Sequence, residues 1–375
     1  MIIIAAIISL LYLFLIGSFI IGFNKLPTFK LINTAPKIKF TIIVPFRNEA
    51  DNLLALFNSF SKLNYPNNLY EIILVNDGSS DDFKPLINTF KKENPKLNFR
   101  KINNLRKSNS PKKDALNTAI NSANFDWIIT TDADCVVPEK WLLIFNDFIK
   151  KNETVFIAAP VLFKGKTNFL FHFQSLNFIS LIGTTIGSFG IKKPFMCNGA
   201  NLCFKKEAFF KVNGYNENLS IASGDDVFLL EKMIRFYPNN VHYLKNNFAL
   251  VKTNSQKSWS NFIQQQLRWA SKTSSYKNSF AKLVGMLVLA ENILLISLLI
   301  LAFIKPDLWI LFITIFLLKL IIDSVLLIQT SNYFKRKFSI FNILTISLFY
   351  PFFIGFIGFL SFFNKYEWKG RTFKK

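Results

Sequence analysis

The stretch Asp126-Trp127-Ile128-Ile129-Thr130-Thr131-Asp132-Ala133-Asp134-Cys135 passes from a short apolar run to two carboxylates at positions i and i+2. A short, almost wholly apolar run is typical of a strand buried on both faces of a parallel sheet. Open α/β sheets bind ligands beyond the carboxyl ends of such strands, where Asp132 and Asp134 would lie. Two carboxylates there suit Mg²⁺ or Mn²⁺. The alternative is a polar turn between strand and helix, because this spacing alone is a weak signal.

Strand-like runs alternate with helical runs on both sides of this stretch. Further strands are predicted at Phe40–Pro45, Glu71–Val75 and Leu97–Ile102, and polar residues follow the first two. Such alternation argues for parallel β-α-β units. We therefore predict an α/β domain over residues 37–280, ending in an interfacial amphipathic helix at Ser258–Tyr276.

The composition is too apolar for an ordinary soluble enzyme. Of the 375 residues, 51% are hydrophobic and 44 are Phe, and the formal net charge is +22. A positive excess suits nucleic acid, an anionic membrane surface or an anionic substrate. Zinc-finger spacing, an aromatic ribonucleoprotein signature and a basic zipper are all missing from the sequence, so we expect no nucleic-acid partner. The three cysteines form no C-x-x-C pair, which suits reduced thiols in the cytosol.

Residues 1–24 carry no charged side chain and are long enough to cross a bilayer. They lack the basic start and small-residue cleavage site of a signal peptide, so we predict a retained N-terminal anchor. Lys25 and Lys30 follow this segment. By the positive-inside rule, the domain after the anchor faces the cytosol.

A C-terminal transmembrane region is predicted over residues 283–364, followed by a basic tail at 365–375. Its spans are Leu283–Ile304 and Leu308–Ile328, and a third charge-free run, Phe338–Asn364, contains Pro351. One anchor and three later spans would put the basic tail outside, against the positive-inside rule. Either the last run is re-entrant near Pro351 or the tail is an exception. Within the second span, Lys319 and Asp323 are spaced for an ion pair, and a polar lining for a lipid or glycan path is the alternative.

Several motifs occur in one order along residues 38–280. They are Val44-Pro45-Phe46-Arg47-Asn48-Glu49, Val75-Asn76-Asp77-Gly78-Ser79-Ser80-Asp81, Asp132-Ala133-Asp134, Gly224-Asp225-Asp226 and Gln265-Gln266-Leu267-Arg268-Trp269. In combination they resemble membrane-bound family 2 glycosyltransferases, which include cellulose, chitin and hyaluronan synthases and ceramide-type glucosyltransferases. The resemblance implies an α/β architecture of the GT-A type, a Rossmann-like mixed sheet with helices on both faces, together with transmembrane helices.

The resemblance also implies roles for single residues. The metal ligands would be Asp132 and Asp134, holding Mn²⁺ or Mg²⁺. The donor-binding residues would be Glu49, Asp77, Lys112, Asp132 and Arg268, and the acceptor-binding residues would be Gln265 and Trp269. The general base would be Asp226, favoured over Asp225, since an acceptor hydroxyl is a poor nucleophile until a carboxylate removes its proton.

Each role has a structural alternative. Asp77 suits a helix cap, and the carboxylates at 225–226 suit the first turn of a helix. Lys112 suits a solvated charge, and the glycine that follows it in the family's stretch is replaced by Asp114. The residues at 265–269 also suit an amphipathic helix on the membrane.

We therefore predict an inverting, metal-dependent glycosyltransferase in the cytoplasmic (inner) membrane, multi-pass, with its catalytic domain facing the cytosol. The expected donor is a nucleotide sugar, in the first place a UDP-sugar. The expected acceptor is a membrane-associated lipid. One alternative is a processive synthase of the cellulose, chitin, hyaluronan or poly-N-acetylglucosamine type. An alternative of another class is a non-catalytic subunit that binds a sugar nucleotide.

Overall fold

The computed structural model describes residues 2–272, 275–363 and 366–373, and the chain divides into two compact units. The sheet unit comprises Pro27–Lys164 and Met196–Asn254, and the helical unit comprises Met1–Leu26, Gly165–Phe195 and Ser255–Lys375. The predicted domain at 37–280 therefore has parts in both units, because residues 165–195 and 255–280 pack with the long apolar helices. Lys365, Lys374 and Lys375 of the predicted tail lie outside the described residues.

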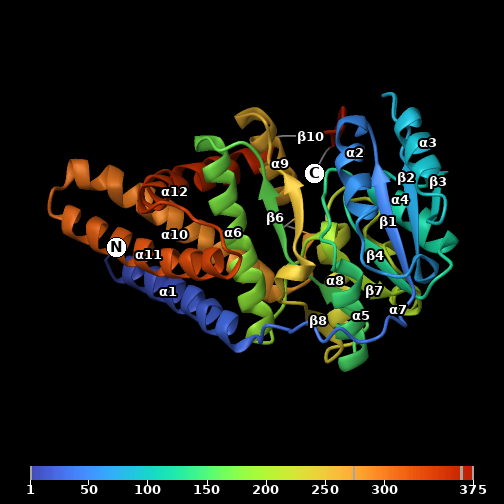
Figure 1. Ribbon diagram of the computed structural model, residues 1–375. Coiled ribbons are helices and arrows are strands. Elements are labelled where there is room, and N and C mark those ends of the chain that lie inside the picture. The colour runs from blue at the N-terminus through green and yellow to red at the C-terminus, as the bar shows by residue number, and fades with distance from the viewer. Residues whose placement is uncertain (1, 273–274, 364–365, 374–375) are drawn as a thin grey trace. The chain divides into compact units, whose positions relative to one another are not determined.

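The sheet unit is built on a seven-stranded mixed sheet with the order β3-β2-β1-β4-β7-β5-β8 (Figure 1). The strands are β1 Phe40–Phe46, β2 Tyr70–Asn76, β3 Asn98–Asn103, β4 Trp127–Thr130, β5 Phe156–Ala158, β7 Leu202–Lys205 and β8 Val241–Tyr243. The first four strands in this order are parallel, β7 is antiparallel to both neighbours, and β5 and β8 are parallel. A separate pair joins β6 (Val161–Lys164) to β9 (Val251–Asn254). The predicted α/β class is confirmed.

Both faces of the central strands are covered. Successive residues of a strand point to opposite faces, yet Ile42, Ile43 and Val44 of β1 are all 0% exposed. The helices of this unit are α2 Ala50–Phe60, α3 Lys84–Glu93, α4 Pro111–Ser122, α5 Trp141–Lys151, α7 Lys206–Lys211 and α8 Asp225–Phe236. Phe57 of α2, for example, packs on Phe99 of β3 with ring centroids 5.7 Å apart. This burial explains why the strands read as continuous apolar runs.

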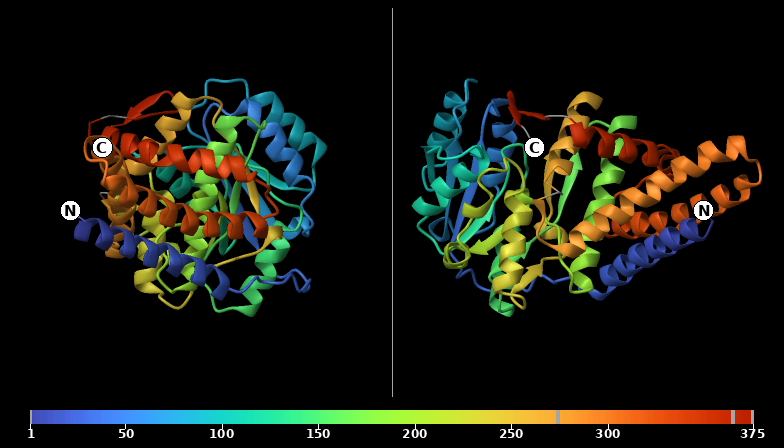
Figure 2. Two further views of the ribbon diagram at one scale, coloured as in Figure 1. Left: turned by 90° about the vertical axis from the view of Figure 1, so that its left-hand side faces the viewer. Right: turned by 180° about the vertical axis from the view of Figure 1, so that it is seen from behind.

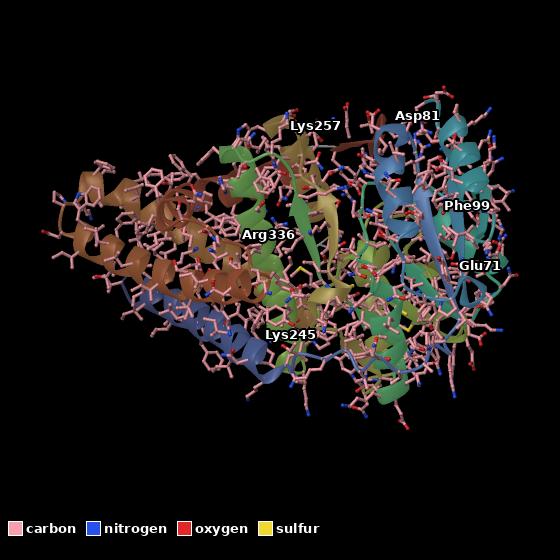
Figure 3. All side chains as sticks on the ribbon, in the orientation of Figure 1. Glu71, Asp81, Phe99, Lys245, Lys257 and Arg336 are labelled. Atoms are coloured by element: carbon pink, nitrogen blue, oxygen red, sulfur yellow. The ribbon has the colours of Figure 1, made fainter. Side chains whose placement is uncertain are left out.

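The strand order creates a switch point at β1, which pairs with β2 on one side and with β4 on the other. The carboxyl ends of these three strands therefore meet at one edge, the usual ligand-binding edge of such sheets. Figure 3 marks this edge, since Asp81 lies beyond the carboxyl end of β2 and Glu71 lies at its start. Because β7 is antiparallel to β4, its first residues begin at the same edge.

The helical unit consists of α1 Ile2–Lys25, α6 Phe169–Gly190, α9 Trp259–Ser271, α10 Ser279–Ile304, α11 Leu308–Tyr333 and α12 Ile340–Phe363. Among the described residues, five helices are long and apolar enough to cross a membrane: α1, α6, α10, α11 and α12. The sequence predicted four of these; α6, Phe169–Gly190, was not among the predicted spans. The last is a single helix that passes through Pro351 without a break.

Glycines bring the C-terminal ends of α1 and α6 into close contact, and Figure 2 shows the blue α1 and the green α6 meeting there. A Cβ atom on Gly187 would lie 2.4 Å from the carbonyl oxygen of Phe19, and one on Gly22 would lie 2.1 Å from that of Gly187. Small residues at such crossings let helix backbones approach within a membrane. The predicted pair is also present, since Lys319 Nζ lies 2.6 Å from Asp323 Oδ2, whose other oxygen accepts a hydrogen bond from Tyr12 on α1.

Asp147 on α5 fastens the segment that leads from α1 to β1. Its carboxylate accepts hydrogen bonds from the backbone N–H groups of Ile32, Asn33 and Thr34 at 2.8, 2.7 and 3.1 Å, and from the Thr34 hydroxyl at 2.6 Å. Burial alone would raise the pKa of Asp147, but these donors outweigh it and lower the pKa. The ionised carboxylate therefore stabilises the fold.

We expect Asp147→Asn to lower the free energy of unfolding at pH 7 by about 1.5–3 kcal/mol, the usual contribution of hydrogen bonds to a charged group. A carboxyl group with a lowered pKa stabilises the fold above its unfolded pKa of about 3.9. That contribution disappears as the pH falls through the folded pKa, so wild type and variant should converge in acid. Thermal unfolding of the full chain in detergent at pH 7 and in acid measures this, with the exposed Asp82→Asn as control. If the difference in stability between wild type and variant did not become smaller in acid, this prediction would be wrong.

Candidate active site

Lys112 holds two of the predicted carboxylates together at the carboxyl edge of the sheet. Its Nζ lies 2.9 Å from Asp132 Oδ1 and 3.1 Å from Asp225 Oδ2. Lys112 projects from the first turn of α4, Asp132 follows β4, and Asp225 opens α8. Burial alone would lower the pKa of Lys112, but the carboxylates of Asp132 and Asp225 outweigh it and raise the pKa. Lys112 is therefore a fixed cation of this cluster, and the solvated-charge alternative is wrong.

Asp226, the predicted general base, is held by backbone N–H groups. Its Oδ2 accepts from Gly199 N–H at 3.2 Å and its Oδ1 from Val227 N–H at 2.8 Å. Gly224, with φ at 82°, turns the chain into α8. Asp225 is buried against Lys112, whereas Asp226 is only half-buried. Of the two carboxylates, Asp226 is therefore the more exposed.

Gly199 belongs to this site although the sequence did not identify it. A Cβ atom here would lie 2.9 Å from Asp225 Oδ2, so only glycine brings its N–H group this close. Its carbonyl oxygen accepts a hydrogen bond from Thr130 Oγ1 at 2.7 Å, which ties it to the end of β4. The available signal was the Asn-Gly pair just before β7, a pair that is typical of turns.

Asp132 and Asp134 both lie just past β4 and are half-buried. Among the described residues, no group of three or more His, Cys, Asp or Glu side chains is placed to hold a metal ion. Two carboxylates nevertheless fit Mg²⁺ or Mn²⁺, because such ions commonly take one or two carboxylates and complete their shell with substrate phosphates and water. The residues therefore fit an ion that binds together with a diphosphate.

A second polar cluster surrounds Asp77 at the end of β2. Its Oδ1 accepts from Arg106 Nε at 2.8 Å and from Asn104 Nδ2 at 2.7 Å. Arg47 Nη1 donates to the backbone oxygens of Asp77 and Gly78 at 2.9 and 2.8 Å. Asp77 does not cap α3, whose N-cap position is Phe83, so the helix-cap alternative is wrong. The sequence did not identify Arg47, Arg106 or Asn104 as members of this cluster.

Glu49 lies beside the same edge, between β1 and α2. It is buried, and its Oε2 accepts from Asn52 Nδ2 at 2.5 Å. The first N–H group of α2, that of Ala50, is satisfied by Asp81 Oδ2 at 2.7 Å. Asp81, in the segment after β2, therefore caps α2, the helix after β1. This contact connects the segment that carries Glu49 to the segment that carries Asp77.

The residues after Lys112 explain why an aspartate is tolerated at 114. Asp114 accepts from the N–H groups of Lys107 and Ser108 at 3.0 and 2.8 Å and so holds the preceding loop. Lys113 is 0% exposed and donates to the carbonyl oxygens of Asn218 and Ile221, both at 2.7 Å. Lys113 thereby anchors the segment that leads to Asp225 and Asp226.

The predicted residues Gln265, Arg268 and Trp269 lie on α9, in the helical unit. Trp269 stacks on Phe178 of α6, with ring centroids 6.0 Å apart. Gln265 Oε1 is buried and has no hydrogen-bond partner within the described ranges. Such an atom is costly to bury, which suits a polar ligand.

Comparisons with known proteins identify the family of the chain. The family described as "Glycosyl transferase family group 2" matches residues 127–354, and "Glycosyl transferase family 2" matches residues 41–212. A poly-β-1,6-N-acetyl-D-glucosamine synthase of Staphylococcus epidermidis is 26% identical over 228 residues, 60% of this chain and 52% of the relative. One from Staphylococcus aureus is 28% identical over 251 residues, 66% of this chain and 57% of the relative. The chain spans about half the length of the curated relatives it matches.

A solved structure shares the fold. It is a mannosyltransferase from Pyrobaculum calidifontis in complex with GDP-Man and Mn²⁺, with a TM-score of 0.55 at 16% identity. The match covers 89% of this chain and 96% of that chain. At this identity the likeness concerns the fold alone.

Proposed function

The chain belongs to glycosyl transferase family group 2, and from this we propose that it transfers a sugar from a nucleoside diphosphate sugar to a hydroxyl group of a membrane-associated acceptor. The observation that carries the proposal is the cluster of Lys112, Asp132, Asp225 and Asp226 at the carboxyl edge of the sheet. The non-catalytic alternative is disfavoured, because a carboxylate is present at each predicted catalytic position.

In the reaction, Asp226 accepts the proton of the acceptor hydroxyl as its oxygen attacks the anomeric carbon. The bond between that carbon and the β-phosphate oxygen breaks, and the nucleoside diphosphate leaves with the bonding electrons. The proposed mechanism uses one base and no covalent nucleophile, so the configuration at the anomeric carbon is inverted. The N–H groups of Gly199 and Val227 orient the carboxylate for this step.

The donor is bound by the other residues of the edge. Glu49 and Asp77 recognise the nucleoside, and the cation of Lys112 lies beside the diphosphate. Asp134, with Asp132, would hold Mg²⁺ or Mn²⁺, which supplies positive charge against the negative charge that develops on the leaving diphosphate. Lys112 can also oppose this negative charge, because its ion pairs with Asp132 and Asp225 keep it positively charged.

The relatives named as polymer synthases favour a second candidate, repeated transfer of N-acetylglucosamine to a growing chain. Incubating membranes that contain the protein with labelled UDP-GlcNAc, UDP-glucose and GDP-mannose, and then separating lipid-soluble from polymeric product, distinguishes the two candidates. Label in the lipid fraction supports one transfer to a lipid, and label retained as polymer supports the synthase. Incorporation from none of a wider panel of sugar nucleotides would reject transfer altogether.

We propose that the sheet unit and the basic C-terminal tail lie on the cytosolic side. The tail contacts α9, since Glu367 N–H donates to Gln264 Oε1 at 3.0 Å. Only a short segment separates α9 from the start of α10, so the tail lies on the side where α10 enters. If α10 and α11 cross the membrane as a pair, α12 begins on this same side. The tail places the end of α12 on this side as well, so in this proposal α12 does not cross. The proposal removes the conflict with the positive-inside rule. The other long apolar helix, α6, lies between two segments of the sheet unit along the chain, so this proposal requires that α6 does not cross the membrane.

Single cysteines placed in a chain without Cys135, Cys197 and Cys203 test this orientation. We expect Lys30→Cys and Thr372→Cys to resist membrane-impermeant thiol reagents in intact cells and to react after lysis. Asp307→Cys, in the short connection between α10 and α11, should react in intact cells and serves as the control. Labelling at position 372 in intact cells would place the tail outside.

A further inference from the structure

The end of the chain, predicted as a basic tail, folds into a β-hairpin. Its strands are β10 Tyr366–Trp368 and β11 Arg371–Phe373, paired antiparallel. Lys369 and Gly370 form the connection with φ values of 53° and 69°. Two successive residues with positive φ are typical of the tight turns that match the twist of a hairpin. The hairpin is thus a defined element.

The hairpin packs on the turn of α9 that carries the predicted donor-binding arginine. Tyr366 is 4% exposed and forms an apolar cluster with Leu267 of α9 and Ile357 of α12. The guanidinium carbon of Arg268 lies 5.4 Å from the centroid of the Trp368 ring. This distance is within the range of a cation–π contact, which is best formed with tryptophan.

A stacked guanidinium loses less entropy when it binds an anion. A free arginine side chain has about 2 kcal/mol of rotamer entropy, and a planar partner fixes the plane of its donors in advance. Trp368 is itself held by the hairpin, with its ring centroid 6.3 Å from that of Phe373. The pair therefore presents a pre-oriented guanidinium to an anionic partner.

We propose that Trp368 is a positioning residue for Arg268, and that the C-terminal hairpin pre-orients this guanidinium for binding a diphosphate. The inference rests on the proposed function, in which the donor and the released product supply the diphosphate, and on the donor-binding role that the family resemblance implies for Arg268. Trp368 touches no reacting atom in this account and acts only through the arginine.

Two substitutions separate stacking from packing. Trp368→Phe keeps an aromatic face, whereas Trp368→Leu keeps an apolar side chain without one. We expect the leucine variant to raise the donor KM and the Ki of the nucleoside diphosphate product by roughly 2- to 30-fold, the range of cation–π contributions. The phenylalanine variant should stay close to wild type. The acceptor KM and the unfolding midpoint should be unchanged in both, and Thr372→Ala, exposed on the same hairpin, is the matched control.

A double-mutant cycle tests whether Trp368 acts through Arg268. In an Arg268→Ala background, Trp368→Leu should add no further loss, because the group that it positions is gone. Additive losses, equal effects of Phe and Leu, or an unchanged donor KM in the leucine variant would each overturn the inference. If the wild type transferred no sugar, the proposed function would fail. Titrating nucleoside diphosphate against the unfolding midpoint would then still compare the Leu and Phe variants, and equal affinities would overturn the inference.

Discussion

Replacing Asp226 by asparagine is expected to lower turnover by at least about a hundredfold, because general-base catalysis contributes about 10²–10⁴-fold. Asparagine keeps the size of the side chain, and its amide oxygen can accept the hydrogen bond of one backbone N–H group, either Gly199 or Val227. It cannot take up the proton of the acceptor hydroxyl. Donor affinity should change little, since the carboxylate acts on the acceptor.

Asp225→Asn is the matched comparison for this prediction. Asp225 is engaged by Lys112 at 3.1 Å, so its replacement loosens the cluster without removing the base. We expect a smaller loss of turnover than in Asp226→Asn. Initial rates and donor titrations on both variants measure the two effects separately. Near-normal turnover in Asp226→Asn would contradict the assignment and make Asp225 the next candidate base.

The sequence predicted those features that depend on neighbouring residues. The strand at Trp127–Thr130 is buried on both faces, and such a strand is recognisable because its residues are nearly all apolar. The carboxylates after it could be placed at the binding edge, because the carboxyl end of a parallel strand is the usual ligand edge. Glu49 and Asp77 were singled out by the family resemblance, and both follow strands that end at that edge.

Contacts between distant segments could not be predicted in this way. Gly199 reaches Asp226 because β7 runs antiparallel to β4, and alternating strand and helix patterns predict only parallel neighbours. Lys113 resembles a surface charge beside Lys112, and only the fold shows that it is buried against the backbone of residues 218 and 221. The membrane segments were recognised by length and apolarity. Their packing depends on close approaches such as that of Gly22 to Gly187, which periodicity does not encode.

The C-terminal hairpin could not be predicted from the sequence either. Its turn residues, Lys369 and Gly370, suit a tight turn, but the strands on either side are too short for a recognisable alternating pattern. Packing against α9 and α12 stabilises it instead. A chain terminus that is basic in composition can therefore hold a specific position through a few aromatic side chains.

Removal of divalent metal is expected to abolish transfer, and Asp134→Asn is expected to weaken both metal-dependent donor binding and turnover. The proposed function gives Asp134, together with Asp132, the task of holding the ion, and Asp132 also lies 2.9 Å from Lys112. Without the ion, the charge that develops on the leaving diphosphate is opposed only by protein cations, which raises the barrier.

Activity should vanish in excess chelator and return with Mn²⁺ or Mg²⁺. Asp134→Asn should need at least about tenfold more Mn²⁺ for half-maximal activity, a loss of the size usual when the surroundings of a metal ligand are altered. Electron paramagnetic resonance of Mn²⁺ in the presence of nucleoside diphosphate measures the same affinity without turnover, and the exposed Asp82→Asn is the control. Full activity in excess chelator would exclude a metal-assisted transfer. An unchanged Mn²⁺ affinity in Asp134→Asn would mean that residues other than Asp134 bind the ion. A loss of Mn²⁺ affinity in Asp134→Asn, with donor binding lowered in parallel, would establish that one carboxylate beyond β4 connects the ion to the diphosphate.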